Sequence, residues 1–150
     1  MKLTSPAFLN NEFIPVRYSA YGLNLNPPLE IEGVPENVKS LVLILDDPDV
    51  PRNLREDGIW DHWIVFNIPP WTISVQEGKE PRGVHGKGTG GNLKYHGPRP
   101  PSGTHRYFFK LYALDSFLNL GEGVSKKEVE EAMQNHIIAK CELMGRYSKE

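Results

Sequence analysis

The sequence contains only one cysteine, Cys141, among its 150 residues. A single cysteine cannot form a disulfide within the chain, and it excludes a metal site built from several thiolates. The sequence also has little net charge, −2 at pH 7, whereas a dedicated nucleic-acid-binding protein usually carries a strong basic excess. No apolar run has the length of a signal peptide or of a membrane span. These absences predict a soluble, cytoplasmic protein with no nucleic-acid partner and with peripheral membrane contact at most.

The composition, 39% hydrophobic and 24% charged, is typical of a globular protein, and the length predicts a single domain covering residues 1–150. The apolar residues gather in short runs that prolines and glycines interrupt, which is the pattern of strands and turns. The run at 39–45 is apolar throughout, so we expect it to be buried on both faces. Pro15 confines the first run to a sheet edge or to a short strand. The predicted strands are 11–18, 29–31, 39–45, 59–68 and 105–114.

One helix is predicted late in the chain. Ser125 and Glu128 have the spacing of a capping box, and Gly145 supplies a stop. Apolar residues then recur at helical spacing, namely Val129, Ala132, Met133, Ile137, Cys141 and Met144. Cys141 and His136 lie on this stripe and are interpreted as packing residues. Strands with proline turns and one late helix predict a mostly β fold, an antiparallel β-sandwich with a C-terminal helix.

Charged residues of opposite sign gather in two segments. Residues 46–61 are rich in carboxylates, whereas residues 82–110 contain lysines, arginines and three histidines with no acidic residue. Two solvated loops would explain this pattern, but if the segments meet they form a site with carboxylates and cationic donors. His105 is the candidate at its centre, because a proline-rich turn delivers it to the start of a strand. A satisfied polar residue at an ordinary turn is the alternative.

A second candidate, His62, lies in the predicted strand 59–68. With period-two alternation, Trp60 and His62 share one face, and Asp61 and Trp63 share the other. The glycine-rich segment 82–92 matches G-x-G-x-x-G, but no apolar strand precedes it and no helix follows, so it predicts a mobile loop and no dinucleotide site. No close histidine pair has metal-ligand spacing. We therefore expect no metal and no cofactor.

Three motifs identify the chain as a member of the phosphatidylethanolamine-binding protein family, also called the Raf kinase inhibitor protein family. The motifs are Asp-Asp-Pro-Asp-Val-Pro at 46–51, His-Trp-Ile-Val-Phe-Asn-Ile-Pro at 62–69 and Gly-Pro-Arg-Pro-Pro-Ser-Gly-Thr-His-Arg-Tyr at 97–107. The similarity extends to residues 24–29 and to residues 132–139 in the predicted helix. The short chain resembles the bacterial and archaeal branch.

The resemblance implies two stacked antiparallel sheets and a small cavity that binds anions such as phosphate. It implies that Asp49 buttresses the aspartate-proline turn. Arg99 departs from prokaryotic relatives, which often have cysteine there, and the chain lacks the longer C-terminal extension of eukaryotic members. By the resemblance, the cavity is lined by Asp47, Pro51, Trp60, His62, Gly97, Pro101, His105 and Tyr107.

The function that we expect is noncatalytic binding of a small anion or phosphorylated ligand, such as phosphate or a phospholipid headgroup. His62 and His105 would then act as charged donors to the anion. The resemblance adds regulation or inhibition of a protein partner, a kinase or a protease, through the rim of the pocket. Whether the protein forms a homodimer is left open by the sequence. One alternative is a hydrolase or metal-dependent enzyme that uses the histidines and aspartates. Another is an interaction protein whose cavity binds no ligand.

Overall fold

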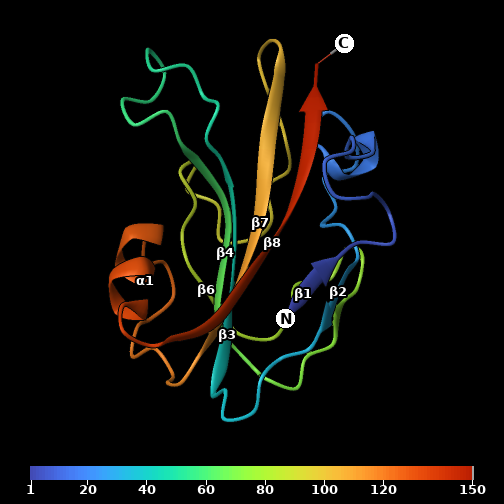
Figure 1. Cartoon of the computed structure of the whole chain (residues 1–150). Helices are drawn as coiled ribbons and strands as arrows, with labels where there is room; N and C mark the ends of the chain where they lie inside the picture. Colours follow the sequence, from blue (N-terminus) through green and yellow to red (C-terminus); the bar gives the residue numbers. More distant parts are fainter. Residues whose placement is uncertain (150) are drawn as a thin grey trace.

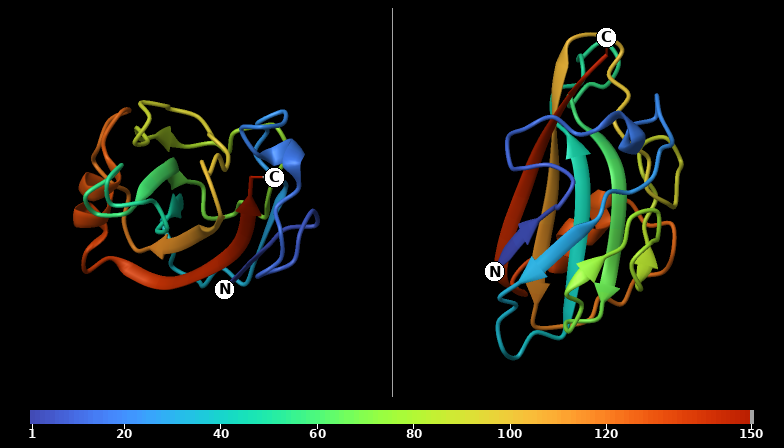
Figure 2. Two further views of the ribbon diagram at one scale, coloured as in Figure 1. Left: turned by 90° about the horizontal axis from the view of Figure 1, so that it is seen from above. Right: turned by 90° about the vertical axis from the view of Figure 1, so that its right-hand side faces the viewer.

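The computed structural model describes residues 1–149, and a five-stranded antiparallel sheet with the order β6-β4-β3-β7-β8 is its main element. A three-stranded antiparallel sheet, β1-β2-β5, covers one face, and helix α1 covers the other (Figure 1). The view from above in Figure 2 shows these three layers in order. The elements are β1 (Lys2–Thr4), a 3-10 turn (Val16–Tyr18), β2 (Leu29–Glu32), β3 (Ser40–Asp47), β4 (Trp60–Ile68), β5 (Ser74–Val75), β6 (Val84–His85), β7 (Thr104–Leu114), α1 (Lys126–Met133) and β8 (Ile137–Ser148).

The central strand β3 is buried along its whole length. Leu41, Leu43 and Leu45 point into the core between the two sheets, whereas Val42 and Ile44 point into a second core beneath α1. Alternate side chains of a strand face opposite sides, so a strand covered on both faces must be apolar throughout. The prediction of a doubly buried strand is therefore confirmed, and so is the mostly β sandwich.

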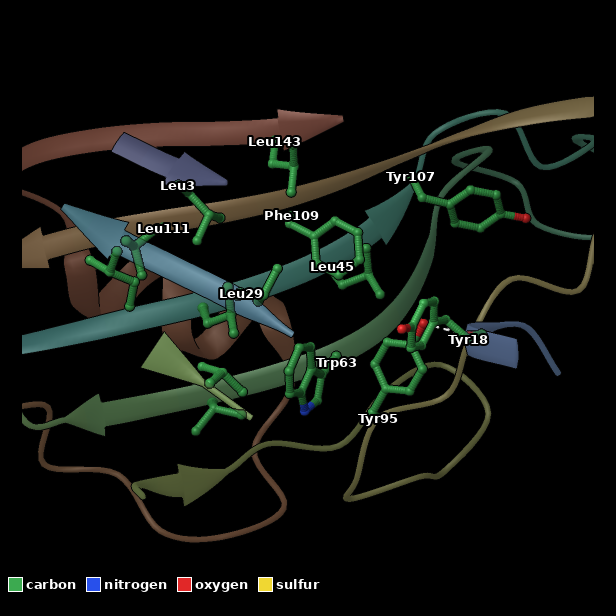
Figure 3. Packing of buried hydrophobic residues seen from close by; sticks show 14 of the residues in the cluster. Leu3, Tyr18, Leu29, Leu45, Trp63, Tyr95, Tyr107, Phe109, Leu111 and Leu143 are labelled. Carbon is green, nitrogen blue, oxygen red and sulfur yellow. Dashed lines mark hydrogen bonds between the residues drawn. The ribbon is translucent and has the colours of Figure 1, made fainter. Parts of the chain in front are cut away.

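The core between the sheets is filled by side chains from both layers. Figure 3 shows Leu3 and Leu29 of the small sheet facing Trp63 and Phe109 of the large sheet. Tyr107 lies apart from these residues, at one end of the core (Figure 3). The candidate site lies at the ends of strands that form this core.

The start of the predicted helix is correct, but its length is wrong. Ser125 Oγ accepts a hydrogen bond from the Glu128 amide (3.2 Å), and the Glu128 carboxylate accepts one from the Ser125 amide (3.1 Å), which completes the capping box. The helix ends at Met133, and Asn135, with φ 68°, turns the chain into β8. His136 lies in this turn, exposed, with Nδ1 2.8 Å from an Asp115 oxygen, and so is not a packing residue of a helix.

Strand β8 explains why the helical prediction fails. Its inward-facing residues, among them Cys141 and Leu143, pack on the core between the sheets. The strand as a whole pairs with β7 along the full length of β7. The spacing of the apolar residues in this segment is compatible with a helix and also with a strand. Pairing with β7 decides in favour of the strand. Gly145 is not a helix stop. A Cβ there would lie 2.4 Å from Ile14 Cγ1, so glycine allows the N-terminal segment to pack against β8.

Two other segments differ from their predictions. Residues 11–18 do not form an edge strand, because only Phe13 makes a β-bridge, to Arg146, before the 3-10 turn. The segment still joins β8, since the Asn11 amide donates to the Met144 carbonyl and the Ile14 amide to the Arg146 carbonyl, each at 2.8 Å. The glycine-rich segment 82–92, predicted as a mobile loop, contains β6 and is hydrogen-bonded to β4 and to Val124.

Candidate functional site

The candidate site is a cavity of about 370 Å³ at the end of the large sheet where β3 ends and where β4 and β7 begin. Because antiparallel neighbours run in opposite directions, these three strand ends meet at one edge of the sheet. Loops 48–59 and 86–103 complete the walls. The lining residues are Asp47, Val50, Leu54, Trp60, His62, Gly90, Asn92, His96, Arg99, Pro100, Pro101, His105 and Tyr107.

The acidic and basic segments of the sequence meet at this edge. His105 Nδ1 donates to Asp47 Oδ2 at 2.6 Å, and both side chains are almost fully buried. Asp49 does not line the cavity but accepts from the Arg106 amide and from its guanidinium at 2.8–2.9 Å, and its own amide donates to Asp47 Oδ1. Asp49 therefore orients Asp47, which in turn orients the His105 ring.

His62 reaches the cavity because β4 has a β-bulge there. Leu45 pairs with Trp63 and Asp46 pairs with Asp61, so His62 is an extra residue with no counterpart on β3. Its carbonyl instead accepts from Asn92 Nδ2 at 2.8 Å. The predicted sharing of a face by Asp61 and Trp63 is therefore wrong, because the bulge puts Trp63 in the core between the sheets and Asp61 toward α1. His62 and Trp60 both line the cavity.

The surroundings of His62 differ from the charged donor that the sequence led us to expect. The residue is 4% exposed, and Nδ1 lies 2.8 Å from the His96 carbonyl oxygen. Burial lowers the pKa of His62 to about 4, against an ordinary value of 6.5. A buried cation loses its hydration, and one carbonyl does not replace it. At neutral pH His62 is therefore an uncharged imidazole.

Other polar groups in the cavity have no partner within the protein. The Tyr107 hydroxyl and His96 Nδ1 are buried and form no hydrogen bond with any residue of the described 1–149. Burial and the nearby Asp47 carboxylate raise the pKa of Tyr107, so its phenol keeps its proton. Burial also raises the pKa of Asp47, and this effect outweighs the hydrogen bond from His105, which lowers the pKa. Unpartnered polar groups in a cavity are the expected anchor points of a ligand.

The structure separates the residues that the resemblance assigned to the cavity into two groups. Asp47, Trp60, His62, Pro101, His105 and Tyr107 line it. Asp49, Pro51 and Gly97 do not line it. Pro51 is exposed, and Gly97 packs behind the wall, where a Cβ would lie 2.1 Å from the Tyr18 carbonyl oxygen. Sequence reasoning missed Val50, Leu54, Gly90, Asn92, His96 and Pro100, which all come from loops. The histidine-rich cationic segment was the only signal that pointed to His96.

A buried ionic cluster lies on the opposite side of the bulge from the cavity. Lys126 Nζ, at the start of α1, is 3.1 Å from Asp46 Oδ2 and 2.8 Å from Asp61 Oδ1. The Lys126 side chain is 12% exposed. Burial alone would lower the pKa of Lys126, but the two carboxylates outweigh burial and raise it. The charged lysine therefore ties together the two strands that frame the bulge.

Within residues 1–149, no group of three or more histidine, cysteine or acidic side chains is arranged to hold a metal ion. None of the helices over the same residues combines the length and the apolar character that crossing a bilayer requires.

Comparison with known proteins places the chain in a family. The family model for phosphatidylethanolamine-binding protein matches residues 4–148. The UPF0098 protein of Chlamydia trachomatis serovar D is 49% identical over 150 residues, covering 100% of both chains, and that of Methanothermobacter thermautotrophicus is 46% identical, covering 99% of both. The crystal structure of CT736 from C. trachomatis, described as a homologue of phosphatidylethanolamine-binding protein, has a TM-score of 0.95 at 49% identity, covering 99% of this chain and 97% of its own. E. coli YbcL, described as a member of the mammalian PEBP family, has a TM-score of 0.89 at 28% identity, covering 99% and 98%. The chain therefore belongs to the phosphatidylethanolamine-binding protein family.

Proposed function

We propose that the protein is a noncatalytic binding protein for a small oxyanion, with inorganic phosphate as the simplest ligand. The observation that carries the proposal is the Tyr107 hydroxyl, which is buried in the cavity wall with no hydrogen-bond partner in the described chain. A buried hydroxyl without a partner costs about 1–3 kcal/mol, and an anionic oxygen bound beside it would recover this cost.

The charges around the cavity support an anion in a defined position. The exposed Arg99 lies on the rim and supplies positive charge, and its guanidinium has a geometry suited to phosphate. The Asp47 carboxylate is engaged by His105 and by the Asp49 amide, which reduces its repulsion toward a bound anion. The described lining residues include no serine, threonine or cysteine, the nucleophiles of covalent hydrolases. This composition favours binding over hydrolysis.

Replacing Tyr107 by phenylalanine tests the proposal. We expect the affinity for inorganic phosphate to fall about tenfold, because one hydrogen bond to a charged oxygen is lost. The free energy of unfolding should stay the same or rise, since the hydroxyl removed has no partner in the protein. Titration calorimetry and urea denaturation measure the two quantities. Unchanged phosphate affinity would contradict the role of Tyr107, and a large loss of stability would show that its hydroxyl supports the fold.

Arg99 should contribute more weakly and in a salt-dependent way. For Arg99→Ala we expect phosphate affinity to fall by about 1 kcal/mol or less at low salt, and the difference from wild type should shrink as salt is added. Stability should hardly change because the side chain is exposed. Calorimetry at two salt concentrations provides the measurement. A loss of affinity that salt does not reduce would place the guanidinium in direct, desolvated contact with the ligand.

The proposal extends to a protein partner that binds at the rim of the pocket and recognises whether the pocket is occupied. Leu54 is 58% exposed and lines the cavity from loop 48–59, and Arg99 lines it from loop 86–103. An exposed leucine next to an arginine is a common composition for a contact surface. A partner bound here would cover the bound anion, so occupancy of the pocket would control the interaction.

A further inference from the structure

His62 Nδ1 fixes the hydrogen-bonding character of the whole ring. A carbonyl oxygen can only accept, so Nδ1, 2.8 Å from the His96 oxygen, must carry the proton. A neutral imidazole has one proton, so Nε2 of the same ring is left with a lone pair. The ring lines the cavity, so a ligand that occupies the cavity can reach this lone pair. His62 therefore offers the cavity an acceptor.

The neighbours of His62 reinforce this acceptor character. His96, whose ring centroid is 6.0 Å away, has a pKa lowered by burial, so it too presents one bare nitrogen. The Asp47 carboxylate on β3 is a further acceptor in the cavity, whereas Asp46 lies outside the cavity and pairs with Lys126. On β7, His105 donates Nδ1 to Asp47, and the edge-to-face Tyr107 ring lies 5.4 Å from the His62 ring. The donors to a ligand are therefore the Tyr107 hydroxyl and the rim cation Arg99, and the acceptors are the bare nitrogens of His62 and His96.

We infer that the pocket selects an oxyanion that still carries a hydrogen, which it donates to His62 Nε2 while another oxygen accepts from Tyr107. The inference rests on the proposed oxyanion binding and adds the hydrogen-bonding character of the ligand. Inorganic phosphate retains at least one hydrogen near neutral pH. Sulfate has none, and neither has a phosphodiester of the kind found in phospholipid headgroups. The pocket should therefore distinguish these anions.

Hydrogen phosphate and sulfate are a closely matched pair for the test, because both are tetrahedral dianions and they differ by one hydrogen. With sulfate, an anionic oxygen would face the lone pair of His62 Nε2, and the imidazole would be left unsatisfied. An unsatisfied buried polar group costs enough to change affinity about tenfold or more. We expect the same loss of affinity for dimethyl phosphate, a phosphodiester whose oxygens carry no hydrogen.

The experiment is titration calorimetry of the full chain with inorganic phosphate, sulfate and dimethyl phosphate at about pH 7.5, where phosphate is mainly the dianion. We expect phosphate to bind about tenfold or more tightly than either of the others. Nitrogen NMR of His62 should show a neutral ring protonated on Nδ1, both free and with phosphate bound. Protonation of Nε2 in the phosphate complex would overturn the inference.

The variant His62→Asn removes the acceptor and keeps the internal hydrogen bond. The asparagine amide nitrogen occupies the position of Nδ1 and can donate to the His96 carbonyl, but no atom replaces Nε2. The preference for phosphate over sulfate should fall toward unity in this variant. His136→Asn is the matched control, because His136 is exposed and lies outside the cavity, and its preference should equal that of wild type.

The outcomes separate the inference from the proposed function. If sulfate or dimethyl phosphate binds wild-type protein as tightly as phosphate does, the inference is wrong and oxyanion binding stands. The inference is equally wrong if His62→Asn keeps the full preference for phosphate. If none of the three anions binds, oxyanion binding fails and takes the inference with it.

Discussion

Replacing Lys126 by methionine should lower the free energy of unfolding by about 3–5 kcal/mol, which is the usual cost of removing one partner from a buried ionic group. Lys126 is the cation that lies within 3.1 Å of Asp46 and within 2.8 Å of Asp61. Methionine fills a similar volume, so packing changes little and the loss reports the buried Asp46 and the partly exposed Asp61, which lie beside each other without Lys126. Urea denaturation at neutral pH measures the effect.

Lys110→Met is the matched control for this prediction. Lys110 Nζ also contacts Asp46 Oδ2, at 3.2 Å, but its side chain is 33% exposed. Water screens such a pair, so we expect a loss of about 1 kcal/mol or less. If Lys126→Met cost no more than Lys110→Met, water would be solvating Asp46 and Asp61 in place of the lysine. The cluster would then contribute little to holding the two strands at the bulge.

The second large effect is a loss of stability in acid that comes from His62. Its pKa is about 4 in the folded protein and 6.5 is its ordinary value, so the unfolded chain binds a proton that the folded protein refuses. The contribution of His62 is therefore fully present above about pH 6.5 and is lost as the pH falls toward 4. Two to three pKa units correspond to about 3 kcal/mol.

The measurement is the difference in unfolding free energy between wild type and His62→Asn at about pH 7 and about pH 4. The difference removes other titrating groups, among them Asp47, whose raised pKa acts in the opposite direction. Wild type should lose about 3 kcal/mol relative to the variant on acidification. Parallel curves for the two proteins would mean that His62 becomes charged as readily when folded as when unfolded, and the neutral acceptor would be excluded.

The sequence predicted the parts of the fold whose burial pattern is strong and local. Strands β3, β4 and β7 are apolar runs limited by prolines or acidic turns, and the capping box at Ser125 correctly marked the start of α1. Strands β1, β5 and β6 have two or three residues each and are defined by their partners, so no local signal exists for them. Strand β8 was assigned to the helix, because residues that face inward in a strand can also share helical spacing.

The candidate site was less accessible to prediction than the fold. Motif resemblance led to Asp47, His105 and Tyr107, which line the cavity, but it could not give their protonation or their partners. The neutral state of His62 follows from a bulge and from the His96 carbonyl, which lies 34 residues away in the sequence. Period-two alternation assumes a regular strand, so it could not place Asp61 and Trp63 on opposite faces.

The pairing of the N-terminal segment with β8 has a consequence for synthesis on the ribosome. The Asn11 carbonyl accepts from Arg146 Nε, a residue 135 positions later. At about 5–20 residues per second, translation needs on the order of 10 s to connect them. Until then residues 11–14 lack the β8 backbone groups with which they pair, and once β7 has been synthesised its outer edge has unpaired backbone groups until β8 follows. We expect this interval to be the period in which the growing chain is most prone to aggregate and most accessible to chaperones.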